Sequence, residues 1–182
     1  MSEYIAEILD IYNGDIKGTA TIPANREICE INDKSLMLDD NIGENFHFFV
    51  AKLLWIMKRE RHDTEVAIYF LCTRVTVPIE EDQNKLERLL DFLYMTRDDE
   101  RIIGFNNNST VYTYIDTSYV VHRNTREYAC GVITFGSTII HGKSSKQNIK
   151  VKSSTEEELV GMSEYIPYTL WFGYFWRHKD MN

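Results

Sequence analysis

The hydrophobic period of the chain changes near Gly104, from about 3.6 residues before it to about two residues after it. Apolar residues at i, i+3, i+4, i+7, i+8 and i+11 begin at Phe46 and predict a helix over 46–57. Beyond the turn signal NNNST, the alternating stretch VYTYIDTS predicts a strand instead. A chain with helices in one part and strands in the other is predicted to have an α+β fold.

Residues 46–104 are predicted to form a helical lobe. After the first helix, a second is expected over 63–73, and Pro78 separates it from a third that carries the apolar stripe Leu86, Leu89, Leu90 and Leu93. Residues 1–45 mix short apolar pieces with turn signals and the polar run DDNIGEN. This first segment is predicted to be an extended or irregular lead-in.

Residues 105–182 are predicted to form a second lobe in the order strand, strand, strand, helix. CGVITFG and STIIHGKS are short β-branched stretches bounded by glycine, which follow the first strand. In KSSTEEELVG, serine or threonine is followed three residues later by glutamate, the capping-box pattern of a helix start. Pro167 is predicted to bend or interrupt that helix.

The distribution of charge limits the partners of the chain. Its net charge of −8 argues against general binding to nucleic acid, because phosphate contacts need lysine and arginine. Residues 117–155 are an exception, because six basic residues there are opposed only by Glu127. The second lobe, which contains Asp116, is therefore locally basic.

The cysteines, the length of the apolar runs and the charge of the N-terminal sequence indicate the cellular compartment. Cys29, Cys72 and Cys130 are odd in number and widely separated, so they predict neither a disulfide framework nor a zinc site. No apolar run is long enough to span a membrane, and the N-terminal sequence is acidic where a secretory signal would be basic. We therefore expect an intracellular protein with reduced thiols, cytoplasmic or nuclear, that has no membrane partner.

Asp116 interrupts the alternating strand TYIDTSYVVH and needs an explanation, because a carboxylate inside a strand is costly unless it is paired or solvated. One interpretation is a strand end or exposed edge where Asp116 meets water. The other is a metal-binding carboxylate that is held on a rigid strand. The residues alone leave both interpretations open.

Several segments together resemble the polyprotein of copia-type retrotransposons, where the end of the reverse transcriptase joins the ribonuclease H. They occur in the family's order and spacing over most of the chain. The segments are FHFFVAKLLWIMKRERHD, AIYFLCTRVTVPIEED, KLERLLDFL, YIDTSYVVH, GVITFG, KSSKQ, KSSTEEELVG and PYTLW. The resemblance implies a thumb-like helical region over 46–104 and a partial, truncated ribonuclease H-like α/β domain over 105–182.

The resemblance also implies a site. In this family, the acid of the first strand and a glutamate in the first turns of the helix bind Mg²⁺ or Mn²⁺, which matches Asp116 and Glu158. Two metal ions held by shared carboxylates would cleave the RNA strand of an RNA–DNA hybrid. Glu158 has a plainer interpretation as the capping partner of Thr155. Four lysines are expected near phosphate, or else in a solvated loop: Lys143, Lys146, Lys150 and Lys152.

The chain also departs from the family. The family site needs further acids after the helix, where this sequence ends at WRHKDMN, and two carboxylates are a poor cage for two hydrated cations. Ala129, Cys130 and Gly131 replace a Thr-Gly-Gly triplet, and Cys130 would be strained at a positive φ. We therefore expect a retrotransposon-derived fragment that does not cleave alone and works with the rest of a polyprotein. The alternative is a non-catalytic remnant that binds nucleic acid or protein.

Overall fold

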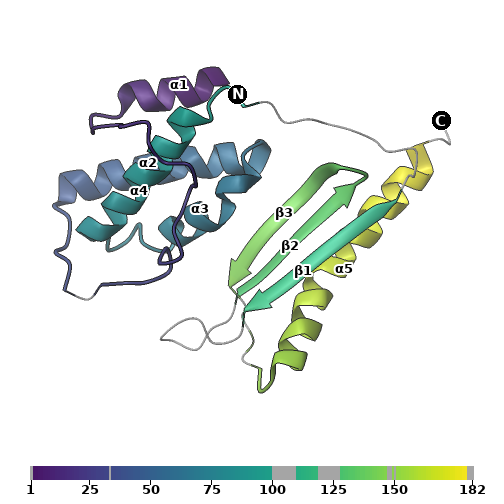
Figure 1. Cartoon of the computed structure of the whole chain (residues 1–182). Helices are drawn as coiled ribbons and strands as arrows, with labels where there is room; N and C mark the ends of the chain where they lie inside the picture. Colours follow the sequence, from purple (N-terminus) through teal and green to yellow (C-terminus); the bar gives the residue numbers. More distant parts are fainter. Residues whose placement is uncertain are drawn as a thin grey trace. The chain divides into compact units, whose positions relative to one another are not determined.

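The computed structural model describes residues 2–32, 34–99, 110–118, 128–146, 149 and 151–179. The chain divides into two compact units, Met1–Arg101 and Ile102–Asn182. Within the described ranges, five α-helices and one three-stranded antiparallel sheet make up the fold (Figure 1). The predicted α+β class is confirmed.

The first unit is helical throughout its regular elements. Its described elements are α1 (Ser2–Ile11), α2 (Asp40–Arg59), the short 3-10 helix η1 (His62–Thr64), α3 (Glu65–Cys72) and α4 (Glu80–Met95). The helices α2, α3 and α4 confirm the three apolar stripes of the sequence. By contrast, α1 is a helix in a segment predicted to be extended or irregular, because its stripe of only three buried residues is too short to stand out.

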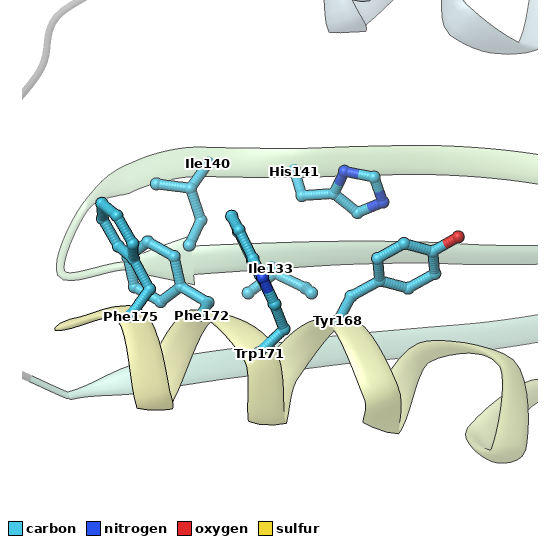
Figure 2. Close-up of a pocket in the computed structure, with 7 residues that line it drawn as sticks. All are labelled: Ile133, Ile140, His141, Tyr168, Trp171, Phe172 and Phe175. Atoms are coloured by element: carbon cyan, nitrogen blue, oxygen red, sulfur yellow. The ribbon is translucent and has the colours of Figure 1, made fainter. Parts of the chain in front are cut away.

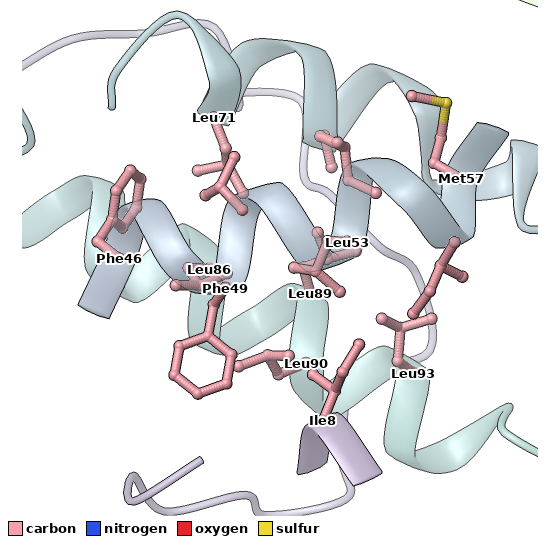
Figure 3. Packing of buried hydrophobic residues seen from close by; sticks show 14 of the residues in the cluster. Ile8, Phe46, Phe49, Leu53, Met57, Leu71, Leu86, Leu89, Leu90 and Leu93 are labelled. Atoms are coloured by element: carbon pink, nitrogen blue, oxygen red, sulfur yellow. The ribbon is translucent and has the colours of Figure 1, made fainter. Parts of the chain in front are cut away.

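A hydrophobic core lies between the helices of the first unit (Figure 3). The predicted stripe of α2 points into it through Phe46, Phe49, Leu53 and Met57, although α2 begins six residues earlier than the stripe. The residues of α4 that complete this layer are Leu86, Leu89, Leu90 and Leu93. Because each fully buried side chain of this kind contributes about 1.5–3 kcal/mol, packing rather than helix propensity holds the unit together.

Asp91 of α4 anchors the irregular segment that follows α1. Its carboxylate accepts hydrogen bonds from the backbone N–H groups of Gly18, Thr19 (2.9 Å) and Ala20 (2.8 Å), and from the Thr19 hydroxyl (3.1 Å). Burial raises the pKa of this carboxyl, but the four hydrogen bonds together outweigh burial and hold its pKa below the ordinary value. Gly18 is suited to this tight approach because its φ is +65°.

Arg61 ties the end of α2 to the end of α4. The guanidinium is buried, pairs with Asp63 at 2.7 Å, and donates to the carbonyl (3.1 Å) and the hydroxyl (2.7 Å) of Thr96. It also lies over the ring of Phe92, 5.3 Å from the ring centroid. Because Arg61 is buried and donates several hydrogen bonds, it holds the ends of α2 and α4 together, and we call this contact the Arg61 clamp.

The second unit is a three-stranded sheet followed by one long helix. Its elements are β1 (Val111–Ser118), β2 (Tyr128–Phe135), β3 (Thr138–Lys146) and α5 (Ser154–Lys179). The strands are antiparallel in the order β1-β2-β3, and Gly136 turns the chain between β2 and β3 with a φ of +61°. This confirms the predicted order of strand, strand, strand and helix.

The helix α5 packs along one face of the sheet (Figure 1). The hydroxyls of Thr113 and Thr169 lie 2.7 Å apart, and a side chain at Gly161 would meet Thr117 at 2.6 Å. Pro167 does not interrupt this helix, because α5 continues across it, and the predicted bend stays a prediction. None of the helices within the described ranges combines the length and apolar composition needed to span a bilayer.

Tyr165 is the residue of α5 that fixes this packing. It is fully buried, and its hydroxyl donates to the carbonyl oxygens of Lys143 (2.6 Å) or Ala129 (3.2 Å) on two neighbouring strands. Its ring covers Gly131 so closely that a Cβ there would lie 2.2 Å from the ring. Gly131 is therefore required by close packing, and Cys130 beside it is an ordinary residue of β2.

Candidate nucleic-acid interface and predicted metal ligands

Asp116 lies on the face of the sheet that α5 does not cover. Successive residues of a strand point to opposite faces, and Thr113, Ile115 and Thr117 face the helix. Asp116 therefore points away from the helix, next to Tyr114, and it is exposed to solvent. The position of Asp116 in β1 agrees with the first interpretation, a carboxylate that is exposed to water on an open face of the sheet.

Glu158 is exposed on α5, and a different glutamate of the same turn faces the sheet. Glu157 is only 1% exposed and is followed at i+4 and i+8 by Gly161 and Tyr165, the residues that contact β1 and β2. The helix cap uses Ser153, whose hydroxyl accepts from the N–H of Glu156, rather than the predicted pair of Thr155 and Glu158. Glu157 was not among the predicted site residues, although its spacing of four and eight residues to Gly161 and Tyr165 places all three on the buried side of α5.

The two predicted metal ligands do not meet in this arrangement. Asp116 points away from α5, whereas Glu158 projects from α5 on the other side of the sheet. In the described part of the chain, no group of three or more histidine, cysteine, aspartate or glutamate side chains is close enough to hold a cation. Since Mg²⁺ is held by converging oxygen ligands, the residues present do not fit the two-metal site implied by the family.

The predicted phosphate-binding lysines are spread over two elements. Lys143 lies on β3, with its ammonium nitrogen 5.8 Å from the centroid of the Tyr168 ring. Lys152 is exposed just before α5, and its backbone N–H donates to Glu156 at 2.8 Å. Lys150 and the side chain of Lys146 lie outside the described residues. Lys143 is thus the predicted lysine whose surroundings can be analysed in detail.

A pocket of about 230 Å³ opens between α5 and the hairpin of β2 and β3 (Figure 2), and Lys143 lies over the ring of Tyr168, one of its lining residues. Figure 2 shows aromatic side chains rising from α5 toward the two strands. The residues that line the pocket are Ile133, Ile140, His141, Tyr168, Trp171, Phe172 and Phe175. None of these described lining residues is acidic, so the pocket is compatible with a planar ring that carries or neighbours negative charge.

The rings of this pocket lie nearly parallel in pairs. His141 stacks on Tyr168 with centroids 4.8 Å apart and planes 24° apart, and Trp171 stacks on Phe175 at 5.7 Å and 14°. Trp171 is 66% exposed, so its ring is open to a ligand. Aromatic faces beside a lysine are the combination that binds unpaired bases together with their phosphates. No local spacing in the sequence predicts the contact of His141 with Tyr168, because only the packing of β3 against α5 brings them together.

A comparison of this chain with models of protein families, with curated proteins and with solved structures finds no match. The resemblance to copia-type polyproteins therefore stays a prediction from the sequence motifs.

Proposed function

We propose that this chain is a retrotransposon-derived fragment that joins the helical end of a reverse transcriptase to the start of a ribonuclease H. In this proposal the ancestral reaction is metal-dependent cleavage of RNA in an RNA–DNA hybrid. The chain alone does not perform it and requires further acids from a longer polyprotein or from a partner.

The order and pairing of the elements of the second unit carry the proposal. Three antiparallel strands in sequential order are followed by a helix that packs on one face of the sheet. Asp116 lies in the first of these strands, and three consecutive glutamates lie in the first turns of the helix. These are the elements and acid positions that the copia-type resemblance implies, although a common fold by itself does not identify a function.

The placement of the acids supports an inactive chain. Two metal ions about 4 Å apart need several shared carboxylates. Asp116 and Glu158 lie on opposite sides of the sheet, and no third acid joins either of them among the described residues. The acid of α5 that faces the sheet is Glu157, so an experiment must distinguish it from Glu158.

The test is cleavage of a labelled RNA–DNA hybrid by the purified chain in Mg²⁺ or Mn²⁺. We expect no cleavage by this chain alone. We expect cleavage from a longer chain that supplies the further acids, with loss of cleavage on Asp116→Asn. Glu157→Gln and Glu158→Gln in that longer chain identify which glutamate takes part in the reaction.

Two outcomes would contradict the proposal in different ways. Cleavage by this chain alone, abolished by Asp116→Asn, would refute the claim that further acids are required. An active longer chain that tolerates Asp116→Asn would refute the role of Asp116 and with it the carry-over from the family. Ser163→Ala, an exposed substitution elsewhere on α5, serves as the matched control.

The second candidate function is a non-catalytic module that binds nucleic acid. The observation that favours it is the aromatic pocket beside Lys143, which has no acidic lining residue among those described. Base stacking on an exposed aromatic ring contributes about 1–3 kcal/mol per base. The module would therefore bind single strands better than duplexes, because a paired base cannot enter the pocket.

Fluorescence anisotropy with labelled single-stranded and duplex oligonucleotides tests this candidate. We expect Trp171→Ala to weaken single-strand binding by about 5–100-fold and Lys143→Ala to reduce its salt dependence. Tyr114→Ala removes an equally exposed aromatic side chain on the other face of the sheet and should change neither property. Equal affinity for single strands and duplexes, unchanged by Trp171→Ala, would rule out the pocket as a base-binding site.

A further inference from the structure

The helix α5 is apolar on two opposite faces, and the sheet covers only one of them. Gly161 and Tyr165 pack against β1 and β2. The opposite side of the helix carries a second stripe, which we call the outer stripe. It consists of Leu159, Met162, Ile166, Leu170 and Tyr174, which are between 49% and 62% exposed. A helix with apolar residues on several sides is normally buried on those sides, so the exposed outer stripe is a surface that another helix or protein is expected to cover.

The charges of α5 indicate what kind of partner fits. Its exposed acidic residues, Glu156 and Glu158, lie in the N-terminal half, whereas Arg177 and His178 are exposed near its C-terminal end. Glu157 and Glu164 face the sheet instead and take no part in this pattern. Two copies of the helix laid antiparallel therefore bring the acidic half of each toward the basic end of the other. The helix dipoles also attract each other in this orientation.

The outer face is also self-complementary in its spacing. Four residues of the outer stripe, Leu159, Ile166, Leu170 and Tyr174, follow one another with Ser163 in steps of three or four between Glu156 and Arg177, so they lie along one side of the helix. A two-fold axis between Ile166 and Pro167 pairs Leu159 of one copy with Tyr174 of the other. Leu159 lies seven residues before Ile166, and Tyr174 lies seven residues after Pro167. The same axis pairs Glu156 with Arg177, each ten residues away.

We propose that this protein dimerises through α5, with the outer stripes of two copies packed antiparallel about a two-fold axis between Ile166 and Pro167. The contact is isologous, as in most homodimers, because the same surface is used by both copies. It extends over about 30 Å of helix, from Glu156 to Arg177, at a rise of 1.5 Å per residue. The two sheets lie on the outer sides of the helix pair, so the aromatic pocket and Asp116 stay outside this contact.

Sedimentation of the full chain over a range of about 1 to 100 µM is the first measurement, because a contact of this size gives a concentration-dependent dimer. We expect Ile166→Glu and Leu170→Glu each to weaken dimerisation by about 100-fold or more, since each change acts twice in the dimer. Leu36→Glu is the matched control, because it replaces a comparably exposed leucine of the first unit and should leave the dimer intact. Circular dichroism checks that each variant keeps its helices.

The antiparallel register has its own test. Glu156→Lys and Arg177→Glu should each weaken the dimer, and the double variant should restore it. Ile166→Cys should form a disulfide-linked dimer on oxidation, whereas Leu159→Cys should not, because Leu159 faces Tyr174 of the second copy. The wild-type chain measures the background from its own three cysteines.

A monomer at every concentration would overturn the proposal and leave the first unit of the same chain, or a different protein, as the cover of the outer stripe. A dimer that is insensitive to Ile166→Glu would place the contact elsewhere. A dimer without rescue by the double charge reversal and without the Ile166→Cys crosslink would overturn the antiparallel register.

Discussion

Asp91→Asn is the substitution with the clearest expected effect on stability. In the folded chain, the Asp91 carboxylate accepts three backbone hydrogen bonds from residues 18–20 and one from the Thr19 hydroxyl. An asparagine amide keeps one oxygen but presents an NH₂ group to the donors that faced the second oxygen. At least one of these N–H groups then loses its acceptor.

The magnitude follows from the number and type of these bonds. Hydrogen bonds to a charged group are worth about 1.5–3 kcal/mol each, and an unsatisfied buried donor costs about 1–3 kcal/mol. We therefore expect Asp91→Asn to lower the free energy of unfolding of the first unit by about 2–4 kcal/mol at pH 7. With a urea m-value of about 2 kcal/mol per M, the unfolding midpoint should fall by about 1–2 M.

The effect should depend on pH in a defined direction. The pKa of Asp91 in the folded chain is lower than its ordinary value, so the unfolded chain takes up a proton first as the pH falls. The stability that Asp91 contributes is therefore present above about pH 4, the unfolded pKa, and is lost as the pH falls through the lower folded pKa. The difference between wild type and Asp91→Asn should shrink over that same range.

Urea denaturation followed by circular dichroism at pH 7 and in acid measures these differences. Hydrogen exchange of the amides of residues 18–20 reports the same contact locally, and these amides should exchange faster in Asp91→Asn. Asp98→Asn is the matched control, because Asp98 is an exposed aspartate of the same unit, paired with Arg97 at the surface. Unchanged stability at pH 7, or a difference that stays constant into acid, would refute the role assigned to Asp91.

Three further substitutions test the packing of the two units. Arg61→Met should lower the free energy of unfolding of the first unit by about 2–4 kcal/mol in urea denaturation, because Asp63 and Thr96 lose a buried charged partner. A loss under about 1 kcal/mol would argue against the Arg61 clamp. Gly131→Ala should destabilise the second unit by about 1–3 kcal/mol, since the new Cβ would strike the ring of Tyr165 2.2 Å away; a thermal midpoint equal to that of the wild type would show that the ring can move. Tyr165→Phe keeps that ring but removes the hydroxyl bonded to strand carbonyls, so a smaller loss of about 1–2 kcal/mol is expected, and a larger loss than for Gly131→Ala would reverse the proposed order.

Periodicity in the sequence determined the elements of this protein. Apolar residues at helical spacing predicted α2, α3 and α4, and alternation with glycine-bounded stretches predicted β1, β2 and β3. The serine–glutamate pattern predicted the start of α5, where Ser153 and Glu156 form the cap hydrogen bonds. These signals are local, because backbone geometry fixes which residues of one helix or strand share a face.

The tertiary structure alone decided which faces are used. Both faces of β1 carry uncharged side chains, Thr113 and Ile115 on one and Tyr112 and Tyr114 on the other, so alternation could not tell whether Asp116 or its neighbours meet α5. An apolar helix such as α5 likewise has no single face marked for burial, and the sheet selects Glu157 rather than Glu158. Asp91 meets partners about 70 positions away in the chain, as in its bond to Thr19 with a separation of 72 residues. Such contacts depend on how separate elements pack, and no local spacing in the sequence records them.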